Sequence, residues 1–311
     1  MSVPASASGN GIECDLAELL ALRLRAGELR ASVHRRSADR NAGARHSPFR
    51  GRGMDYAESR LYAAGDDVRH IDWRVTARTG KTHTKLYQAE RERITAVVVD
   101  TSAGMAFGTR CCFKRVQASR LAALMSWYAE ADGDRLCAAA SGPGASLIPP
   151  AGARRGVLRV LTALAGYSQA QPADGGPGLA VTLDRLGRIL RPGSHVLLLL
   201  DHRSIDAAAL RSLTHLRPHH DLIAAVLVDP IERAAPPPAR YPVLVGGLRS
   251  ILGLESTGVR LAWQNHFEEA LAQAHEGLRR AGVRARNVGT DEDPVAALRL
   301  LLRGVNQRKS A

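Results

Sequence analysis

Residues 94–105, Ile-Thr-Ala-Val-Val-Val-Asp-Thr-Ser-Ala-Gly-Met, constrain the fold more than any other part of this 311-residue chain. Their apolar, β-branched run is typical of a strand buried on both faces, and therefore of the centre of a parallel sheet. Open α/β sheets place their sites beyond the carboxyl ends of such strands, where Asp100 and Ser102 follow. Oxygens at alternate positions of an extended turn can point to one place, as a hard cation such as Mg²⁺ requires. We therefore expect a candidate oxygen-ligand site at this edge.

From residue 94 onward, short apolar strands alternate with amphipathic helices. The pattern predicts strands at 94–100, 135–140, 195–200, 221–228 and 283–288, and helices near 112–131, 153–165, 178–190, 206–216, 264–281 and 293–304. Such alternation predicts an α/β fold with a doubly wound, mostly parallel sheet. We expect this domain to span 93–305, with an irregular insertion near 230–258 that holds a hairpin at 241–254, and a tail at 306–311.

The first 92 residues have a different pattern and are expected to form a separate N-terminal segment. Leucines at helical spacing predict a helix over 12–36, and a loop rich in Gly, Ser and Arg follows at 37–53. Residues 68–91 suggest two extended segments around a turn at Thr79 and Gly80, with Ile71, Trp73 and Val75 alternating on one face. We expect this helix and β-hairpin extension to pack against the main domain or to extend its sheet.

The net charge is strongly positive, +13 at pH 7, from 43 Lys+Arg and 30 Asp+Glu. Such a balance can indicate nucleic acid or an anionic surface as partner. The excess is spread over the whole chain, however, and only residues 23–52 concentrate it, with nine arginines against two acids. We therefore expect nucleic acid not to be the main partner, and regard 23–52 as the segment that would bind it in the alternative case.

The cysteines and the hydropathy pattern point to the cytoplasm. Cys14, Cys111, Cys112 and Cys137 lack CxxC spacing and are expected to be buried thiols in a reducing compartment. No run approaches the roughly 18 apolar residues of a membrane span, and the first residues lack the basic and apolar regions of a signal peptide. We therefore expect a cytoplasmic protein without a membrane span.

The turn after residue 100 resembles a metal-ion-dependent adhesion site of the von Willebrand factor A (Rossmann-like) type. The resemblance implies the pattern Asp-x-Ser-x-Ser, but Gly104 stands in the place of the second serine. Asp201 matches the aspartate expected after a later strand, whereas residues 172–179 lack the expected threonine, and the nearest one, Thr182, belongs to a predicted helix. Asp100, Ser102 and Asp201 remain as candidate ligands of a weakly held Mg²⁺ or Mn²⁺. Alternatively the site is degenerate, and its side chains only cap the following turn.

Two sequence motifs precede the strand VVVDTSAGM: RLYAAGDDVRHIDWRVTAR (60–78) and HTKLYQAERE (83–92). This order resembles the bacterial family called domain of unknown function fifty-eight. The resemblance implies a von Willebrand factor A-like fold and partnership with MoxR-type AAA+ ATPases in the chaperone-like maturation of client proteins. Many relatives carry two N-terminal membrane helices. This sequence shows no such helices, so it resembles a soluble member of the family.

Within this signature, several residues have both a structural and a partner-binding interpretation. Asp66 and Asp67 follow Gly65 in a tight turn, where they can cap the next segment or pair with Arg60, Arg69 or Arg74; otherwise they bind a metal or a partner. Trp73 is expected to anchor a hydrophobic contact. Arg69 and Arg78 are expected to pair with carboxylates of the same domain. The remaining signature residues that we assign to partner binding are Asp72 and Gly104.

The sequence lacks the phosphate-binding glycine patterns and the GxSxG nucleophile turn of common enzyme classes. We therefore expect a non-enzymatic adaptor that contacts its partner around Asp100, Ser102, Gly104 and Asp201. Two alternatives remain: a metal-dependent hydrolase or nuclease that uses Asp100, Asp201 and Asp66, and a nucleic-acid-associated protein that uses 23–52.

Overall fold

The computed structural model describes residues 10–38, 54–63, 66–89, 93–170, 175–245 and 248–303. It divides into two compact units. The main unit consists of residues 1–37 and 93–311, and the signature unit consists of residues 38–92. The predicted loop 37–53 and the tail 306–311 lie almost entirely outside the described residues.

A six-stranded sheet in the order β10-β7-β6-β3-β4-β5 forms the centre of the main unit. Its strands are β3 (Ile94–Asp100), β4 (Arg135–Ser141), β5 (Ser146–Ala151), β6 (His195–Leu200), β7 (Asp221–Val228) and β10 (Arg284–Gly289). All neighbours are parallel except β5, which runs antiparallel to β4 at the edge. Every residue of β3 is buried, as its apolar run predicts. The predicted doubly wound, mostly parallel sheet is therefore confirmed.

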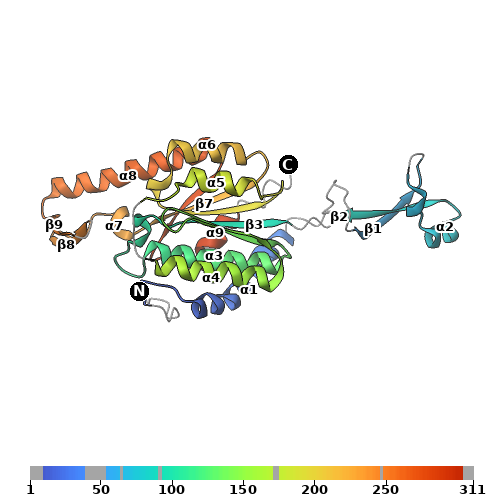
Figure 1. Ribbon diagram of the computed structural model, residues 1–311, viewed down its shortest axis with the longest axis horizontal. Helices are drawn as coiled ribbons and strands as arrows, with labels where there is room; N and C mark the ends of the chain where they lie inside the picture. Colours follow the sequence, from blue (N-terminus) through green and yellow to red (C-terminus); the bar gives the residue numbers. More distant parts are fainter. Residues whose placement is uncertain are drawn as a thin grey trace. The chain divides into compact units, whose positions relative to one another are not determined.

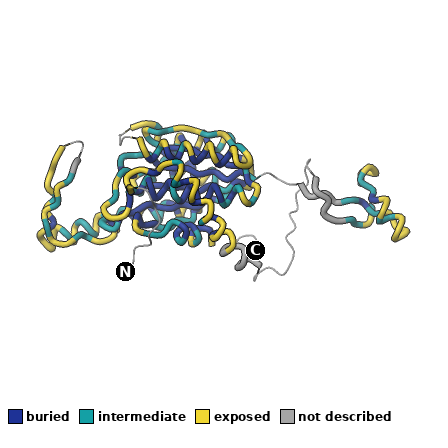
Figure 2. The backbone as a smooth tube through the Cα atoms, turned by 90° about the horizontal axis from the view of Figure 1, so that it is seen from below, coloured by how far each residue is buried: buried dark blue, intermediate teal, exposed yellow. Residues whose placement is uncertain are grey.

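Helices cover both faces of this sheet and create two separate hydrophobic clusters. One face carries α1 (Leu16–Ala38), α3 (Lys114–Ala131), α4 (Ala153–Gln169) and α9 (Pro294–Arg303). The other face carries α5 (Leu179–Gly187), α6 (Ala207–Leu216) and the second half of α8 (Thr257–Arg280). Figure 1 shows α5, α6 and α8 on one side of the strands, and α1, α3 and α4 on the opposite side. Buried residues follow the central strands (Figure 2).

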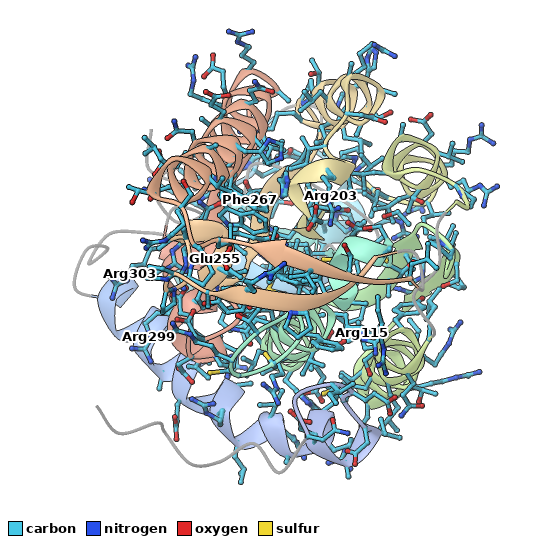
Figure 3. The ribbon with its side chains drawn as sticks, turned by 90° about the vertical axis from the view of Figure 1, so that its left-hand side faces the viewer. Arg115, Arg203, Glu255, Phe267, Arg299 and Arg303 are labelled. Carbon is cyan, nitrogen blue, oxygen red and sulfur yellow. The ribbon has the colours of Figure 1, made fainter. Side chains whose placement is uncertain are left out.

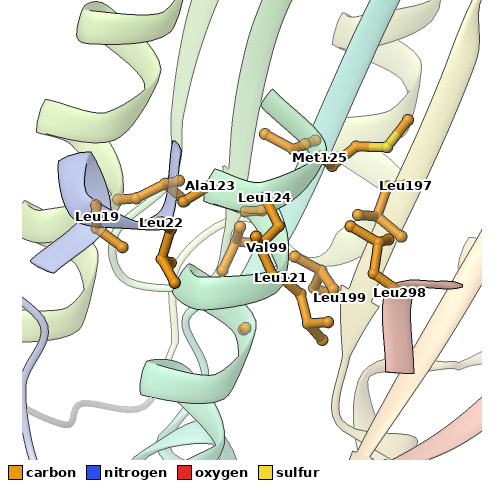
Figure 4. Packing of buried hydrophobic residues seen from close by; sticks show 14 of the residues in the cluster. Leu19, Leu22, Val99, Leu121, Ala123, Leu124, Met125, Leu197, Leu199 and Leu298 are labelled. Carbon is orange, nitrogen blue, oxygen red and sulfur yellow. The ribbon is translucent and has the colours of Figure 1, made fainter. Parts of the chain in front are cut away.

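Helix α1 is part of the main unit. Its Leu19 and Leu29 are fully buried in the cluster that contains α3, and the backbone carbonyl of Leu19 accepts a hydrogen bond of 3.0 Å from Trp127 Nε1. Figure 4 shows Leu19 and Leu22 beside the side chains of α3, with β3, β6 and α9 beyond them. The expected N-terminal segment 1–92 is thus divided, because its helix packs on the main unit while residues 38–92 form a unit of their own.

The expected insertion extends from the carboxyl edge of the sheet. It contains α7 (Pro230–Arg233) and an antiparallel hairpin of β8 (Arg240–Val245) and β9 (Leu248–Gly253), and it leads into α8. Helix α8 begins at Thr257, earlier than the predicted residue 264. Its buried residues, Leu271, Ala274 and Leu278, all lie in its second half.

The signature unit contains a two-stranded antiparallel sheet that is separate from the six-stranded one. Its elements are β1 (Met54–Leu61), the 3₁₀ turn η1 (Val68–His70), α2 (Trp73–Thr79) and β2 (His83–Ala89). The predicted extended segment over Trp73 and Val75 was wrong, because these residues are helical. Asp72 caps the helix, since its carboxylate accepts the backbone N–H groups of Arg74 and Val75, and Gly80 ends it with a left-handed φ of 70°.

Three of the four cysteines are buried as predicted: Cys14, Cys112 and Cys137. Burial raises the pKa of the Cys137 thiol to about 12. Cys111 is exposed, contrary to prediction. In the described part of the chain, no helix has both the length and the apolar character needed to cross a bilayer.

Candidate functional site

The carboxyl ends of β3 and β6 bring Asp100 and Asp201 together, as the sequence predicts. These strands are neighbours in parallel register, with Val99 opposite Leu199. The Oδ2 atom of Asp100 accepts a hydrogen bond of 3.2 Å from the backbone N–H of Asp201. Both side chains are buried, with residue exposures of 1% and 0%. The predicted site therefore exists as a cluster, but its carboxylates lie below the surface.

Protein donors surround the carboxylate of Asp100. Its Oδ1 accepts a 2.8 Å hydrogen bond from the backbone N–H of Ser102, and its Oδ2 accepts one of 3.1 Å from the Ser102 hydroxyl. The hydroxyl of Ser204, which follows β6, also donates to Oδ2. With the Asp201 amide, four protein donors thus reach this one carboxylate.

Asp201 pairs with a buried lysine. Lys114, the first residue of α3, places its Nζ 2.8 Å from Asp201 Oδ2 and 2.7 Å from Glu232 Oε1. The side chains of Lys114 and Asp201 are both 0% exposed. Burial by itself raises the pKa of Asp201, but the charge and hydrogen bond of Lys114 outweigh it and lower that pKa to about 2. The carboxylate of Asp201 is therefore ionised at neutral pH.

The carboxylate of Glu232 contacts both the Lys114 ammonium and a backbone N–H group of its own loop. It is the third residue after Asp229, the N-cap of α7, and the two form a reciprocal capping box. Its Oε2 accepts a 2.8 Å hydrogen bond from the Asp229 backbone N–H, which leaves Oε1 for Lys114. The loop after β7 is thus tied to α3 and, through Lys114, to the end of β6.

Gly104 lies against the guanidinium of Arg203. The Nε of Arg203 donates to Asp201 Oδ1 over 3.1 Å. A Cβ atom on residue 104 would overlap Nη2 of Arg203 and would lie 3.0 Å from Asp201 Oδ2. The place of the missing second serine therefore holds a positive charge. Figure 3 looks onto this edge and labels Arg203 on the same side of the hairpin as Phe267 of α8.

These residues do not fit the divalent ion of a complete adhesion site. Asp201, His202 and Glu232 place one possible ligand atom each within 4.8 Å of one another, but the Lys114 ammonium already contacts two of the three. Residues 175–179 provide no threonine, and the hydroxyl of Thr182 instead lies 3.4 Å from the backbone carbonyl oxygens of Ala140 and Gly178. The carboxylate oxygens of Asp100, Asp201 and Glu232 are therefore engaged with protein donors.

A small cavity of about 30 Å³ lies beside Asp100 and Ser102, and Tyr167 is among the residues that line it. This volume holds about two water molecules. Pockets for small organic ligands are roughly tenfold larger. The cavity therefore has no room for such a substrate.

In the signature unit, the three predicted aspartates support local structure. Asp66 forms a 2.6 Å ion pair with Arg60, one of the pairings that the sequence suggests. Asp67 caps η1 and Asp72 caps α2, and Asp72 also accepts a 2.8 Å hydrogen bond from the Ser59 hydroxyl. Their carboxylates are thus used to hold the turns between β1 and β2.

The other signature residues lie on the surface of this unit. Trp73, which we expected to anchor a hydrophobic contact, is 70% exposed, so most of its side chain is not covered by this chain. Arg69 and Arg78 are exposed, and among the described residues neither guanidinium has a carboxylate partner. The expected arginine–carboxylate pairs are therefore not found in this part of the chain.

Comparison with known proteins assigns the family. The model of the family "Protein of unknown function DUF58" matches residues 58–248, more than half of the chain. The chain belongs to the DUF58 family. The match includes residues 58–92 of the signature unit and the strands at whose carboxyl ends Asp100 and Asp201 lie.

Relatives of this DUF58 chain occur in mycobacteria. "Uncharacterized protein Rv1480" of Mycobacterium tuberculosis (strain ATCC 25618 / H37Rv) and "Uncharacterized protein Mb1516" of Mycobacterium bovis are each 37% identical over 181 residues. Each alignment covers 58% of this chain and 56% of the relative. The chain therefore matches little more than half the length of these curated relatives.

Solved structures similar to the DUF58 chain have low sequence identity. BatB from Bacteroides thetaiotaomicron has a TM-score of 0.42 at 12% identity, with 70% of this chain and all of that chain (100%) covered. A von Willebrand factor type A protein from Catenulispora acidiphila has a TM-score of 0.38 at 15% identity, with 72% and 43% covered. At these TM-scores the similarity adds nothing to the sheet order described above.

Sequence reasoning missed four groups of this DUF58 site: Lys114, Arg203, Ser204 and Glu232. Two of them left a signal. Lysine is rare in this arginine-rich chain, with four among 43 basic residues, and one of the four stands at a helix start. The sequence Asp-Pro-Ile-Glu after β7 is a capping-box pattern and marks Glu232. Arg203 and Ser204 follow Asp201 in a turn whose course the sequence pattern does not define.

Proposed function

We propose that this DUF58 chain is a non-enzymatic, von Willebrand factor A-like adaptor that partners a MoxR-type AAA+ ATPase in protein maturation or complex assembly. The ATPase and the maturation role are implied by the family resemblance. The adaptor role is supported by one observation above all, the open face of α2 in the signature unit.

This open face combines a tryptophan with arginines. Trp73 and Ala77 are four residues apart on α2, as are Arg74 and Arg78, so the four share one side of the helix, and all four are exposed. The half-buried residues Val75 and Thr76 occupy the other side. Tryptophan and arginine are the residue types enriched at the energetic centres of protein interfaces. We therefore place the ATPase contact on this face.

The chemistry of the carboxyl edge supports a non-enzymatic role. A general base needs a carboxylate that is free to take a proton. Asp100 instead accepts hydrogen bonds from Ser102, Ser204 and the Asp201 amide, and Asp201 and Glu232 share the Lys114 ammonium. The adjacent cavity of about 30 Å³ has no room for a phosphoester substrate.

The basic segment 23–52 offers less to nucleic acid than its composition suggests. Arg23 lies over the Trp127 ring at 5.4 Å, and Arg25 forms a 2.5 Å ion pair with Asp293. Arg30 pairs with Asp132 at 3.0 Å. Because these three arginines have partners within the main unit, they favour the adaptor over the nucleic-acid alternative.

The test is a nuclease-treated affinity purification of the full chain from its native host, with the bound proteins identified by mass spectrometry. We expect an AAA+ ATPase to be enriched with the wild-type chain and reduced about tenfold or more by Trp73→Ala or Arg78→Ala. Leu24→Ala and Arg185→Ala are matched controls, because both residues are exposed on the main unit, on α1 and α5.

Two outcomes distinguish a failure of the adaptor role from a failure of the proposed contact surface on α2. If no AAA+ ATPase is enriched with the wild-type chain, the adaptor proposal is overturned. If the ATPase is enriched equally with wild type and Trp73→Ala, the role stands and the contact lies elsewhere than on α2.

A further inference from the structure

We propose that Lys114 and Arg203 take the place of the divalent cation of a complete adhesion site, and that Arg203 binds a carboxylate of the partner directly. The carboxyl edge would then be a metal-independent site for an acidic peptide. The first half rests on geometry alone, whereas the biological meaning of the second rests on the adaptor function.

Lys114 provides the buried part of the positive charge. Its ammonium lies between Asp201 Oδ2 and Glu232 Oε1, at 2.8 and 2.7 Å, with no exposure of its side chain. A lysine suits this position because its compact charge has three donors on a thin stem, whereas a guanidinium is wide and planar. The lysine balances one of the two carboxylates, and a second cation is needed for the other.

Arg203 provides the exposed part. Its Nε contacts Asp201 Oδ1, so the cation is held against the site by the same carboxylate that Lys114 binds. The side chain is 65% exposed, and among the described residues its two terminal nitrogens have no hydrogen-bond partner. A guanidinium held at Nε can still donate from its terminal N–H groups to a carboxylate. Such a group can bind the partner's acid in the way that a metal does in complete sites.

Gly104 is the residue that makes this arrangement possible. Because a Cβ at this position would overlap Nη2 of Arg203, the guanidinium can occupy this place only while residue 104 is a glycine. The absence of a serine side chain at position 104 and the position of the Arg203 guanidinium are thus compatible with each other. The site has not simply lost a ligand, since a cation fills the space in which the ligand would stand.

The ligand that this chemistry favours is a single carboxylate. Asp100, Asp201 and Glu232 are buried and close enough to Arg203 to interact with its charge, and they repel an anion in proportion to the charge of that anion. A side-chain carboxylate carries one negative charge, whereas phosphate carries up to two near neutral pH. We therefore commit to an aspartate or glutamate side chain of a protein partner rather than to a phosphate group.

The first experiment measures metal binding to the full chain. We expect isothermal titration with Mn²⁺ to show no saturable binding, and the thermal midpoint to be the same in Mg²⁺ and in EDTA. Stoichiometric Mn²⁺ binding that is lost in Asp100→Asn would overturn the replacement of the metal by Lys114 and Arg203.

The second experiment measures carboxylate binding without any partner. The backbone amide signals of Gly104 and Ser204 are followed by NMR while a capped Gly-Glu-Gly peptide, its Gly-Gln-Gly twin or inorganic phosphate is added at constant ionic strength. We expect saturable shifts with the glutamate peptide only, and their loss in Arg203→Lys. Arg233→Lys is the matched control, since Arg233 is also a surface arginine that pairs with an aspartate.

Equal shifts with the glutamine peptide, or unchanged shifts in Arg203→Lys, would overturn the carboxylate site. Tighter binding of phosphate would overturn the choice of ligand. None of these results depends on the AAA+ ATPase, so failure here leaves the adaptor proposal standing, and failure of the affinity purification leaves this site standing.

Discussion

At the scale of single residues, Gly104 has a different meaning in the structure from the one the sequence suggests. The sequence shows only that a serine is missing, whereas the structure shows Arg203 in the space above the glycine. The two residues are far apart along the chain, and the course of the turn after Asp201 decides that they meet. A local motif therefore located the site but could not identify the groups that complete it.

The contact between Gly104 and Arg203 predicts a coupled pair of variants. Gly104→Ser should destabilise the main unit by about 1 kcal/mol or less, because the new side chain displaces the exposed guanidinium from Asp201. In an Arg203→Ala background the same change should cost much less, since the space is then free. Urea denaturation of the four proteins of this cycle measures the coupling. Additive effects would mean that the two residues do not compete for the same space.

Lys114 should be among the most costly polar residues to replace. Lys114→Met leaves the buried carboxylate of Glu232 without a cation and that of Asp201 with Arg203 alone, and we expect a loss of about 3–5 kcal/mol in the free energy of unfolding. Adding Asp201→Asn and Glu232→Gln should restore most of it, because the unpaired charges are removed. Arg185→Met, on the exposed side of α5, is the control and should change stability little.

The lowered pKa of Asp201 predicts a loss of stability in acid. A carboxyl group whose folded-state pKa lies below its unfolded value contributes stability above the unfolded pKa and loses it as the pH falls through the folded one. For Asp201 this window runs from about pH 4 to about pH 2 and corresponds to about 2 kcal/mol. The stability difference between wild type and Asp201→Asn, measured by urea denaturation, should shrink by that amount across the window. A constant difference would show that Asp201 does not titrate there.

At the scale of elements, the buried parallel strands were predictable and the short polar elements were not. The apolar run at 221–228 matches β7 (Asp221–Val228), because burial on both faces leaves a continuous signal. β5 (Ser146–Ala151) was missed, since it contains two prolines and is partly exposed at the sheet edge, where proline is tolerated. The helix α2 was missed because three alternating apolar residues are too few to distinguish a strand from a helix.

The capping of α2 predicts a large effect on stability for one residue and a small effect for its neighbour. Asp72→Ala removes the acceptor of two backbone N–H groups and of the Ser59 hydroxyl, and should destabilise the signature unit by about 1–2 kcal/mol. Trp73→Ala should change its stability by less than about 0.5 kcal/mol, because that side chain is 70% exposed. Hydrogen exchange of the α2 amides measures both. A large effect of Trp73→Ala would show that the tryptophan supports the fold rather than a partner.

At the scale of the whole molecule, the division into units follows the hydrophobic clusters. One cluster draws its buried residues from Cys14, from α1 and from residue 97 onward, the other from residue 94 onward alone, and neither includes a described residue of the signature unit. The sequence predicted the start of the sheet domain at residue 93 from its change of pattern. It could not assign α1, because an amphipathic helix shows that it packs but not against what.

This division predicts how the main unit responds to two changes. Replacing residues 39–91 by a flexible Gly/Ser linker should leave the free energy of unfolding of the main unit unchanged within about 1 kcal/mol. No described residue of the replaced segment belongs to either hydrophobic cluster. Leu19→Ala should cost about 2–5 kcal/mol, since Leu19 of α1 is fully buried against α3. Loss of folding on linker replacement would show that the two units form one cooperative body.

The position of Lys114 at the first residue of α3 has a consequence for regulation. A bound metal ion exchanges with its surroundings, and its occupancy follows the free concentration of that ion in the cell. A lysine ammonium is part of the polypeptide and is always present at its site, because the fold sets its local concentration. The carboxyl edge of this protein would keep the same charge through any change in magnesium supply. With the proposed partners, control over binding would then come from the acidic segment of the ligand or from the state of the ATPase.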